Sequence, residues 1–417
     1  MHLAYRLLTT LLTPLALLRL QRGPGERGRW RERLGRFARL DFEPIWLHAA
    51  SVGEINAAQG LIAALLERGE PVLVSTMTAT GAARCRELFG TRVSHRYLAL
   101  DNPFSTRTWL DKCRPRLGII VETEIWPELY HQCHRAGVPL VLVSARVSPS
   151  AMRRYRRFPR LFGPALDTVA LAACQSPDDA QRLGRLGLPG DRVIVTGNLK
   201  FDLDLPEDLA SRVSGLRKRW GQRPVWVAGS SRPGEEEILI EAHRQVLENQ
   251  PRALLVLAPR HPQRAAELAR VLDRHGMPWC RFDENPDPDT ATVLVDRLGV
   301  LMDCYGAADA AFVGGSLVAR GGHNLIEPAM QGKPVLAGPH LDQQADAAAA
   351  LSEADGLVIV NSAEALAAVL VEWLSEPDRA SRIGAGAKTA VAAGRGSLDA
   401  TRAALRPWLN RANAKAD

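Results

Sequence analysis

The sequence predicts an α/β protein built from two doubly wound domains. From Pro44 onward, short apolar runs alternate with helical stretches. Runs of four to eight residues that are apolar throughout are typical of parallel strands covered by helices on both faces. These runs form two successive series, separated near residue 203 by the polar stretch DLPEDLASR. We therefore expect two Rossmann-like domains with a cleft between them, and ligands bound at the carboxyl ends of the strands.

The first series defines an expected domain over residues 41–203. Its strands are predicted at 45–50, 71–76, 117–123, 139–145 and 169–174, and the series ends near 192–202. The second series defines an expected domain over residues 204–417, in which the Ala-rich tail from about 377 forms closing helices. Its strands are predicted at 224–230, 253–260, 292–296, 310–316, 334–339 and 356–360.

Composition excludes several classes of protein. The chain of 417 residues has 46% hydrophobic and 24% charged residues, which is ordinary for a globular protein and argues against disorder, collagen and a polytopic membrane protein. Its net charge of +7 is mild and no nucleic-acid motif is present, so we expect no nucleic-acid partner. Six widely spaced cysteines without zinc-ligand spacing indicate buried thiols in a reducing compartment.

Residues 1–40 form a predicted membrane anchor and basic segment. The first twenty residues are mainly apolar but are interrupted by Arg6 and Pro14, and no cleavage site follows Leu20. Residues 19–39 contain eight arginines against two glutamates. The positive-inside rule then places the bulk of the chain in the cytoplasm, attached to the inner leaflet by a signal anchor or an interfacial helix. The alternative is an amphipathic helix packed on the domain, with its arginines solvated.

Acidic residues follow two predicted strands of the first domain. Glu54 lies at a strand-turn-helix corner, where it is either a general base or a first-turn carboxylate stabilised by the helix dipole. Glu122 and Glu124 follow the strand at 117–121 and would share a face of an extended segment. One charge then raises the pKa of the other unless a cation intervenes, which suits catalysis or cation binding. The alternative is that both are salt-bridged in a loop.

Arginines and aromatic residues are interleaved over residues 153–162. The pattern suits phosphate headgroups and acyl chains at a membrane surface, and the alternative is a solvated basic helix face. The arginines expected to contact the acceptor or the anionic lipid surface are Arg153, Arg154, Arg156 and Arg157.

The predicted strand ends of the second domain indicate an anion site. Ser231 and Arg232 lie at a strand-to-helix phosphate corner, and the glycine at Gly315 would let the backbone approach a phosphate closely. Asn324 and Glu327 have capping-box spacing and are either structural or a ligand pair for ribose hydroxyls. Neither a Walker A motif nor G-x-G-x-x-G is present, which weakens NTPase and dehydrogenase interpretations.

Six motifs together resemble one known family. In chain order they are HAASVGE (48–54), ETEIWPEL (122–129), VSAR (143–146), GNLKFD (197–202), APRHPQR (258–264) and GGSLVARGGHNLIEP (314–328). Their order and spacing resemble the 3-deoxy-D-manno-octulosonic acid (Kdo) transferases of lipid A biosynthesis in Gram-negative bacteria, nearly from end to end. The departures are mild, namely Ala319 before Arg320 and the form LIEP, and neither removes a charged group.

The resemblance implies a GT-B glycosyltransferase that moves Kdo from CMP-Kdo to the tetraacyl lipid A precursor with inversion. It implies that Glu54 is the catalytic base and that Glu124 and Lys200 stabilise the transition state. Lys200 would pair with the Kdo carboxylate as the domains close, and its alternative is a hinge salt bridge. The CMP contacts implied by the motifs fall on Pro259, Arg260, Arg297, Leu298, Gly299, Asn324, Leu325, Ile326 and Glu327.

We expect no cofactor and no obligatory metal, because fixed cations suffice for a monophosphate leaving group. Loss of activity with EDTA that Mg²⁺ restores would contradict this. Two rival interpretations stay open. A GT-B transferase that uses a UDP-sugar would show its donor preference in a transfer assay. A membrane-anchored nucleotide-binding scaffold would be unaffected by Glu54→Gln.

Overall fold

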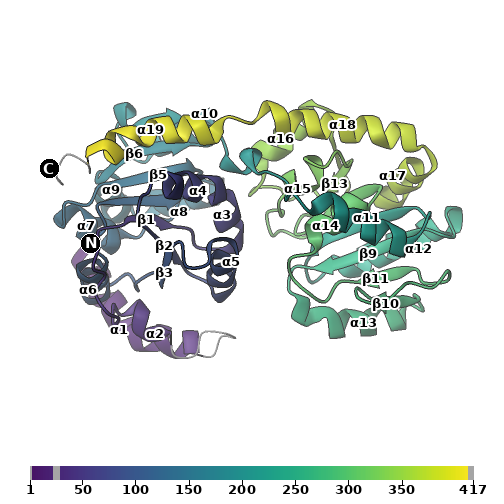
Figure 1. The fold of residues 1–417 in the computed structure, drawn as a ribbon, viewed down its shortest axis with the longest axis horizontal. Coiled ribbons are helices and arrows are strands. Elements are labelled where there is room, and N and C mark those ends of the chain that lie inside the picture. Colours follow the sequence, from purple (N-terminus) through teal and green to yellow (C-terminus); the bar gives the residue numbers. More distant parts are fainter. Residues whose placement is uncertain (1, 22–28, 412–417) are drawn as a thin grey trace. The chain divides into compact units, whose positions relative to one another are not determined.

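The chain folds into two units with separate cores (Figure 1). The computed structural model describes residues 2–21 and 29–411. One unit comprises the chain up to Leu203 together with the residues from Gly394 onward, and the other is Asp204–Ala393. We expected the second domain to run from 204 to 417. Its last segment instead belongs to the first unit, because the apolar face of the last helix is buried there.

The first unit contains a parallel sheet. In the described residues it has seven strands in the order β3-β2-β1-β4-β5-β6-β7. They are β1 (Ile45–His48), β2 (Val72–Thr76), β3 (Ser94–Tyr97), β4 (Leu117–Val121), β5 (Leu140–Ala145), β6 (Val169–Cys174) and β7 (Val193–Val195). The sequence pattern missed β3, because the sequence SHRY contains no apolar run.

Helices cover both faces of this sheet (Figure 1). They are α1 (His2–Gln21), α2 (Trp30–Arg33), α3 (Val52–Ala57), α4 (Gln59–Glu67), α5 (Ala79–Phe89), α6 (Pro103–Cys113), α7 (Pro127–Arg135), α8 (Pro149–Arg157), α9 (Pro159–Leu166), α10 (Pro177–Arg185) and α19 (Ser397–Arg411). Successive residues of β1 enter different cores: Trp46 packs into one cluster, whereas Ile45 and Leu47 pack into the other. This explains why the strands are apolar throughout.

Helix α1 lies on the first unit through polar contacts. Arg6 donates to both carboxylate oxygens of the buried Glu128, at 2.7 and 3.0 Å, and the Tyr5 hydroxyl donates to Asp101 at 2.6 Å. Leucines occupy the outer face; Leu3, Leu7 and Leu11 are each at least 59% exposed. No helix in the described ranges is long and apolar enough to cross a membrane. Arg22 and Arg27 of the expected basic segment lie outside the described residues.

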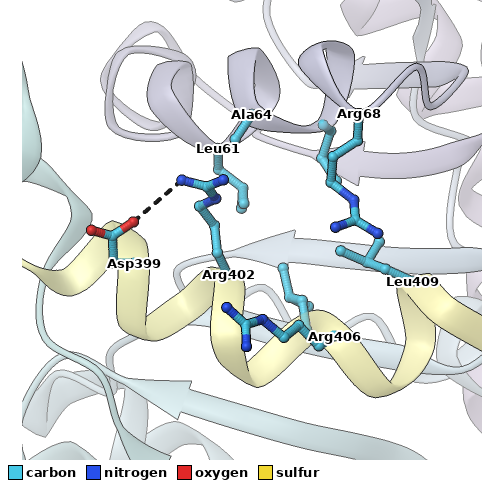
Figure 2. Close-up of a pocket in the computed structure, with 9 residues that line it drawn as sticks. Leu61, Ala64, Arg68, Asp399, Arg402, Arg406 and Leu409 are labelled. Carbon is cyan, nitrogen blue, oxygen red and sulfur yellow. Dashed lines mark hydrogen bonds and ion pairs between the residues drawn. The ribbon is translucent and has the colours of Figure 1, made fainter.

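Helix α19 packs against α4 of the same unit. Leu405 and Leu409 are buried there, and Asp202 accepts hydrogen bonds from the main-chain amides of Gly396 and Leu398, both at 2.7 Å. Residues of both helices line a pocket of about 230 Å³, and Figure 2 shows Arg68, Arg402 and Arg406 among the side chains around it. The pocket contains none of the residues that the sequence motifs single out.

The second unit is built on a second parallel sheet. Its order in the described residues is β10-β11-β9-β8-β12-β13-β14. The strands are β8 (Val225–Ser231), β9 (Leu254–Pro259), β10 (Trp279–Arg281), β11 (Thr292–Leu294), β12 (Ala310–Val313), β13 (Val335–Ala337) and β14 (Leu357–Ile359). The helices are α11 (Leu209–Trp220), α12 (Glu236–Asn249), α13 (Ala265–Arg274), α14 (Leu301–Ala307), α15 (Ile326–Ala329), α16 (Ala345–Glu353), α17 (Ala363–Ser375) and α18 (Pro377–Ala393). The described residues also contain the 3₁₀ helices η1 (Gly190–Arg192) and η2 (Leu199–Asp202) in the first unit and η3 (Pro262–Arg264) in the second.

Each sheet has one point at which the strand order reverses. In the first unit this point lies between β1 and β4, and in the second between β8 and β12. Ligands of open α/β sheets bind outside the carboxyl ends of the strands at such points. The loops that follow these four strands are therefore the first places to look for a site.

Candidate active site

Glu54 is held at the corner between β1 and α3. Ser51 is extended and precedes the helix, and Glu54 lies in its first turn. The Glu54 carboxylate accepts a hydrogen bond from the main-chain amide of Ala50 at 2.5 Å and another from the Ser51 hydroxyl at 3.0 Å. These two contacts fix the orientation of the carboxylate at the reversal point of the sheet.

The surroundings of Glu54 favour its protonated form. Burial, followed by the negative charges of Glu122 and Glu124, raises the pKa of Glu54 to about 8, against the lowering effect of its two hydrogen bonds. A carboxylate stabilised only by a helix dipole would have a lowered pKa. Because a general base works best with a pKa near the working pH, the geometry and the ionisation of Glu54 both suit that role.

Glu122 forms an ion pair with Lys200. Its backbone is left-handed, with φ of +60°, which turns the side chain away from the extended geometry that we expected. Lys200 Nζ donates to Glu122 Oε1 at 2.7 Å, and Arg146 Nη2 lies 3.7 Å from Oε2. Burial alone would raise the pKa of Glu122, but the two cations outweigh it and the pKa is lowered. Lys200 thus contacts Glu122, not Glu124.

Glu124 has a separate set of partners. His48 Nε2 lies 3.0 Å from Glu124 Oε2, and the Trp126 indole donates to the same oxygen at 3.1 Å. His48 Nδ1 lies 2.8 Å from the Ser75 hydroxyl. Burial would raise the pKa of Glu124, but the contacts with His48 and Trp126 lower it. The two glutamates are therefore both ionised, each through its own partners.

The sequence motifs contained His48 but gave it no role. His48 is fully buried at the end of an apolar strand. A buried polar residue at the carboxyl end of a strand is the signal that would have identified it, since such groups need a hydrogen-bond partner. Its partner Ser75 had no comparable signal, because a serine at a strand end is common.

Arg232 is the centre of a basic cluster in the second unit. Its guanidinium lies 3.1 Å from His323 Nε2 and 3.0 Å from His261 Nε2. Burial, followed by Arg232 and Arg260, lowers the pKa of His323 to about 3. Burial, Arg260 and Arg320 likewise lower the pKa of Arg232.

Excess positive charge remains in this cluster. Among the described residues no carboxylate forms an ion pair with Arg260 or Arg320, whereas Arg264 is paired with Glu236 and Glu267. Arg232, Arg260 and Arg320, in the loops that follow β8, β9 and β12, therefore offer a site for an anion.

The glycine loop after β12 holds a protein carboxylate. Glu235 is fully buried and accepts hydrogen bonds from the main-chain amides of Gly315, Ser316 and Leu317, at 2.7, 2.8 and 2.8 Å. The amide of Gly315, which we expected to bind a phosphate, is thus already engaged. Ser231 is also occupied, since its buried hydroxyl donates to Glu236 at 3.2 Å.

Asn324 and Glu327 have a structural arrangement. Asn324 Oδ1 accepts from the amide of Ile326 at 3.1 Å, and its amide group donates to Glu327 Oε1 at 3.1 Å. The side chains of Leu325 and Ile326 are fully buried, so only their main chain is placed to reach a ligand. Pro259 is buried at the end of β9.

The loop after β11 is exposed. Arg297 is paired with Asp283 and lies over the Phe282 ring, 5.7 Å from its centroid. Leu298 is 58% exposed, and Gly299 has a φ of +88°.

The arginines of α8 point to solvent. Arg153, Arg154, Arg156 and Arg157 are exposed, and none forms an ion pair with a carboxylate of the described residues. Tyr155 is buried and packs on Phe162, with ring centroids 4.8 Å apart, so it anchors the helix.

Within the described residues, no group of three or more acidic, His or Cys side chains is arranged to hold a metal ion. Metal independence stays a prediction.

Comparison with known proteins identifies the family. The family model for 3-deoxy-D-manno-octulosonic-acid transferase (kdotransferase) matches residues 28–203. The 3-deoxy-D-manno-octulosonic acid transferase of Haemophilus influenzae is 36% identical over 400 residues, which cover 94% of this chain and 93% of that protein. The chain belongs to the Kdo transferase family. The Bordetella pertussis transferase is 38% identical over 380 residues, covering 88% and 87% of the two chains.

Solved structures confirm the GT-B fold of this Kdo transferase. The Staphylococcus aureus MnaA–UDP structure has a TM-score of 0.60 at 14% identity and covers 88% of this chain and 97% of that chain. The Anabaena HepE complex with UDP and glucose has a TM-score of 0.60 at 15% identity, covering 88% and 100%. At these identities the likeness shows the fold alone.

Proposed function

We propose that this Kdo transferase moves Kdo from CMP-Kdo to a hydroxyl of the tetraacyl lipid A precursor, with inversion, at the cytoplasmic face of the inner membrane. The observation that carries the proposal is Glu54, a buried carboxylate fixed by two hydrogen bonds at the reversal point of the first sheet. Family membership supports the donor and the general class of acceptor.

The chemical step is a single displacement. The acceptor hydroxyl attacks the anomeric carbon of Kdo, the bond from that carbon to the CMP phosphate oxygen breaks, and Glu54 takes the hydroxyl proton. CMP departs with the bonding electron pair. Attack opposite the leaving group inverts the anomeric carbon. A positioned general base contributes about 10² to 10⁴-fold to the rate.

The groups around Glu54 suit the charges of this step. Lys200 and Arg146 bring positive charge to Glu122, and positive charge at this place suits the Kdo carboxylate. Glu124 is held ionised by His48 and Trp126, and an ionised carboxylate stabilises positive charge developing on the sugar ring.

The donor's anionic groups fit the basic cluster of the second unit. Arg232, Arg260 and Arg320 supply fixed positive charge for the departing phosphate. The cytidine contacts on Arg297–Gly299 and Asn324–Glu327 are part of the same proposal, with the ribose near the capped turn at Asn324.

Two surfaces support membrane attachment. The exposed leucines of α1 provide an apolar face suited to the acyl boundary, and the unpaired arginines of α8 suit phosphate headgroups. Because α1 packs on the unit through Arg6 and Tyr5, we propose that it lies along the membrane.

Transfer of Kdo from freshly generated CMP-Kdo to the tetraacyl precursor, followed by mass spectrometry, tests the proposal. We expect wild-type protein to add at least one Kdo mass and Glu54→Gln to lower kcat by about 10³-fold, given the usual weight of a general base. Glu87→Gln is the matched control, because Glu87 is 65% exposed and pairs only with Arg84 in the described chain. CMP binding should be equal in all three proteins. No adduct from folded wild-type protein would refute the proposal.

A further inference from the structure

A second basic cluster lies at the carboxyl ends of β2 and β3. We call it the Tyr97 cluster. Arg29, Arg33 and His95 contact the buried ring of Tyr97. Arg96 lies over the Phe37 ring at 5.2 Å and donates to the main-chain carbonyl of His95 at 2.7 Å, and Arg86 is the fifth member because its charge acts on His95. The guanidinium of Arg33 lies 4.7 Å and that of Arg29 5.3 Å from the ring centroid. Arg29 also donates to the Tyr97 hydroxyl at 3.2 Å, and the His95 ring meets the Tyr97 ring edge-on at 5.3 Å. Arg29 and Arg33 are thus ordered by the Tyr97 ring, and Arg96 by the Phe37 ring.

Three arginines of the Tyr97 cluster act together on His95. Burial has the largest effect on His95, and the charges that act on it most are those of Arg86, Arg29 and Arg96. Together they lower the pKa of His95 to about 4. The carboxylate of Glu32 is near, but it accepts a hydrogen bond from the main-chain amide of Tyr97 at 3.0 Å. Arg33 is fully buried and donates to the main-chain carbonyl of Met77 at 2.7 Å, whereas Arg29, Arg86 and Arg96 reach the surface. None of these three forms an ion pair with a carboxylate of the described residues, so together they favour a bound anion.

The Tyr97 cluster lies near Glu54, the proposed general base. The strand order β3-β2-β1 places Tyr97 two strands from the end of β1, where Glu54 begins its helix. At about 4.8 Å between neighbouring strands, the lateral separation is roughly 10 Å. Arg29 and Arg33 lie at the start and the end of α2, which follows the leucine-faced helix α1. The cluster is therefore linked through α2 to helix α1, which has the leucines proposed to face the membrane. It also lies at the same edge of the sheet as Glu54, the proposed base.

We propose that the Tyr97 cluster binds a phosphate monoester of the acceptor lipid, on the sugar whose hydroxyl is attacked. This rests on the proposed function and adds a binding site for one part of the acceptor. Guanidinium groups bind phosphate oxygens through paired hydrogen bonds, and several arginines can share one phosphate. The four arginines of α8 are all exposed, and Arg154 and Arg157 lie over the rings of Tyr155 and Phe158, an arrangement that suits the membrane surface.

Kinetics with two acceptors tests this inference. The variants are Arg86→Ala, Arg29→Ala and the double substitution, and the control is Arg68→Ala, an exposed arginine on the rim of the α4–α19 pocket. Each is assayed in neutral detergent with the bisphosphorylated precursor and with its dephosphorylated form. With the phosphorylated acceptor we expect the acceptor KM to rise about 10-fold for each single variant and about 100-fold for the double variant, from the usual strength of hydrogen bonds to charged groups. The kcat and the KM for CMP-Kdo should stay near wild type.

The dephosphorylated acceptor gives the decisive contrast. We expect it to bind wild type weakly and to show no further loss in the variants. An equal rise of KM for both acceptors would overturn the inference, as would unchanged KM values in folded variants. If the variants instead lose sedimentation with phosphatidylglycerol vesicles while KM is unchanged, the cluster binds membrane phospholipid and the inference is wrong. Failure of wild type to transfer Kdo would refute the proposed function, which separates the two results.

Discussion

Glu54 is the residue on whose ionisation the proposed reaction depends most directly. Because the carboxylate form is the base and its pKa is about 8, kcat/KM should rise about tenfold per pH unit below 8 and level off above it. Glu122→Gln removes a neighbouring negative charge, which favours ionisation of Glu54 and lowers its pKa. We therefore expect that variant's rising limb to move to lower pH, whatever its maximal rate. A pH–rate profile measures this, and a limb that stays in place would contradict the assignment.

The contacts of Glu235 lead to a prediction about the stability of the protein. Its carboxylate accepts three amide hydrogen bonds from the glycine loop and one from the amide of Arg232, at 2.9 Å. In Glu235→Gln, the side-chain amide group would face N–H donors, and a buried unsatisfied group costs about 1–3 kcal/mol. We expect a lower unfolding temperature and weaker CMP binding, because Arg232 is displaced. Glu237→Gln, on the exposed face of α12, should match wild type in calorimetry and CMP titration.

For single residues, the sequence predicts where a functional residue lies better than it predicts which residues that side chain contacts. Glu54 could be found because a strand-turn-helix corner is a local pattern. The Glu122–Lys200 pair could not, because it depends on a left-handed φ at Glu122 and joins residues 78 positions apart. For Gly315 the sequence predicted an amide free to bind phosphate, and the structure shows that amide already bonded. A glycine-rich loop predicts free amides, but the buried carboxylate of Glu235 comes from a different segment and occupies them.

Among the elements, α1 allows a direct test of membrane attachment. Leu7 and Leu11 are four residues apart on its outer face and are 59% and 76% exposed. Burying one leucine side chain in an apolar phase is worth about 1.5–3 kcal/mol, so Leu7→Lys with Leu11→Lys should weaken vesicle binding by at least about 100-fold. Sedimentation with anionic vesicles measures this. Leu205→Lys, which changes a leucine of 40% exposure at the start of the second unit, should have no effect, and equal binding by all three proteins would rule out α1 as the anchor.

The elements that the sequence pattern predicts are those buried on both faces. Strands β1, β2, β4, β5 and β6 appear where the apolar runs predict them, because helices cover both sides of the sheet. Strands β3 and β10 lie at sheet edges and have polar residues, so no apolar run marks them. Their pairing comes from the neighbouring strand, which a local pattern does not contain.

The whole molecule is two folding units joined by a chain that passes between them twice. The sequence predicted the change near residue 203, where the composition shifts, but not the return at 394, because α18 and α19 are both Ala-rich helices. Which unit a closing helix joins depends on tertiary contacts. Leu405 and Leu409 are buried within the first unit. Asp202 accepts hydrogen bonds from the main-chain amides of Gly396 and Leu398 at the start of α19.

Ending the chain at Ala393 should therefore destabilise the first unit and spare the second. The truncation exposes Leu61 and Leu65 on α4 and leaves Asp202 without its amide partners. Removing two buried leucines alone costs at least about 4 kcal/mol. Hydrogen exchange followed by mass spectrometry should show faster exchange in peptides from β1 and β4 and unchanged exchange in peptides from β8 and β12. Arg406→Ala, on the exposed face of α19, should leave both sets unchanged, because it removes no buried contact. Equal acceleration in both units would mean that they unfold as one body, and the division at 203 and 394 would then have no energetic meaning.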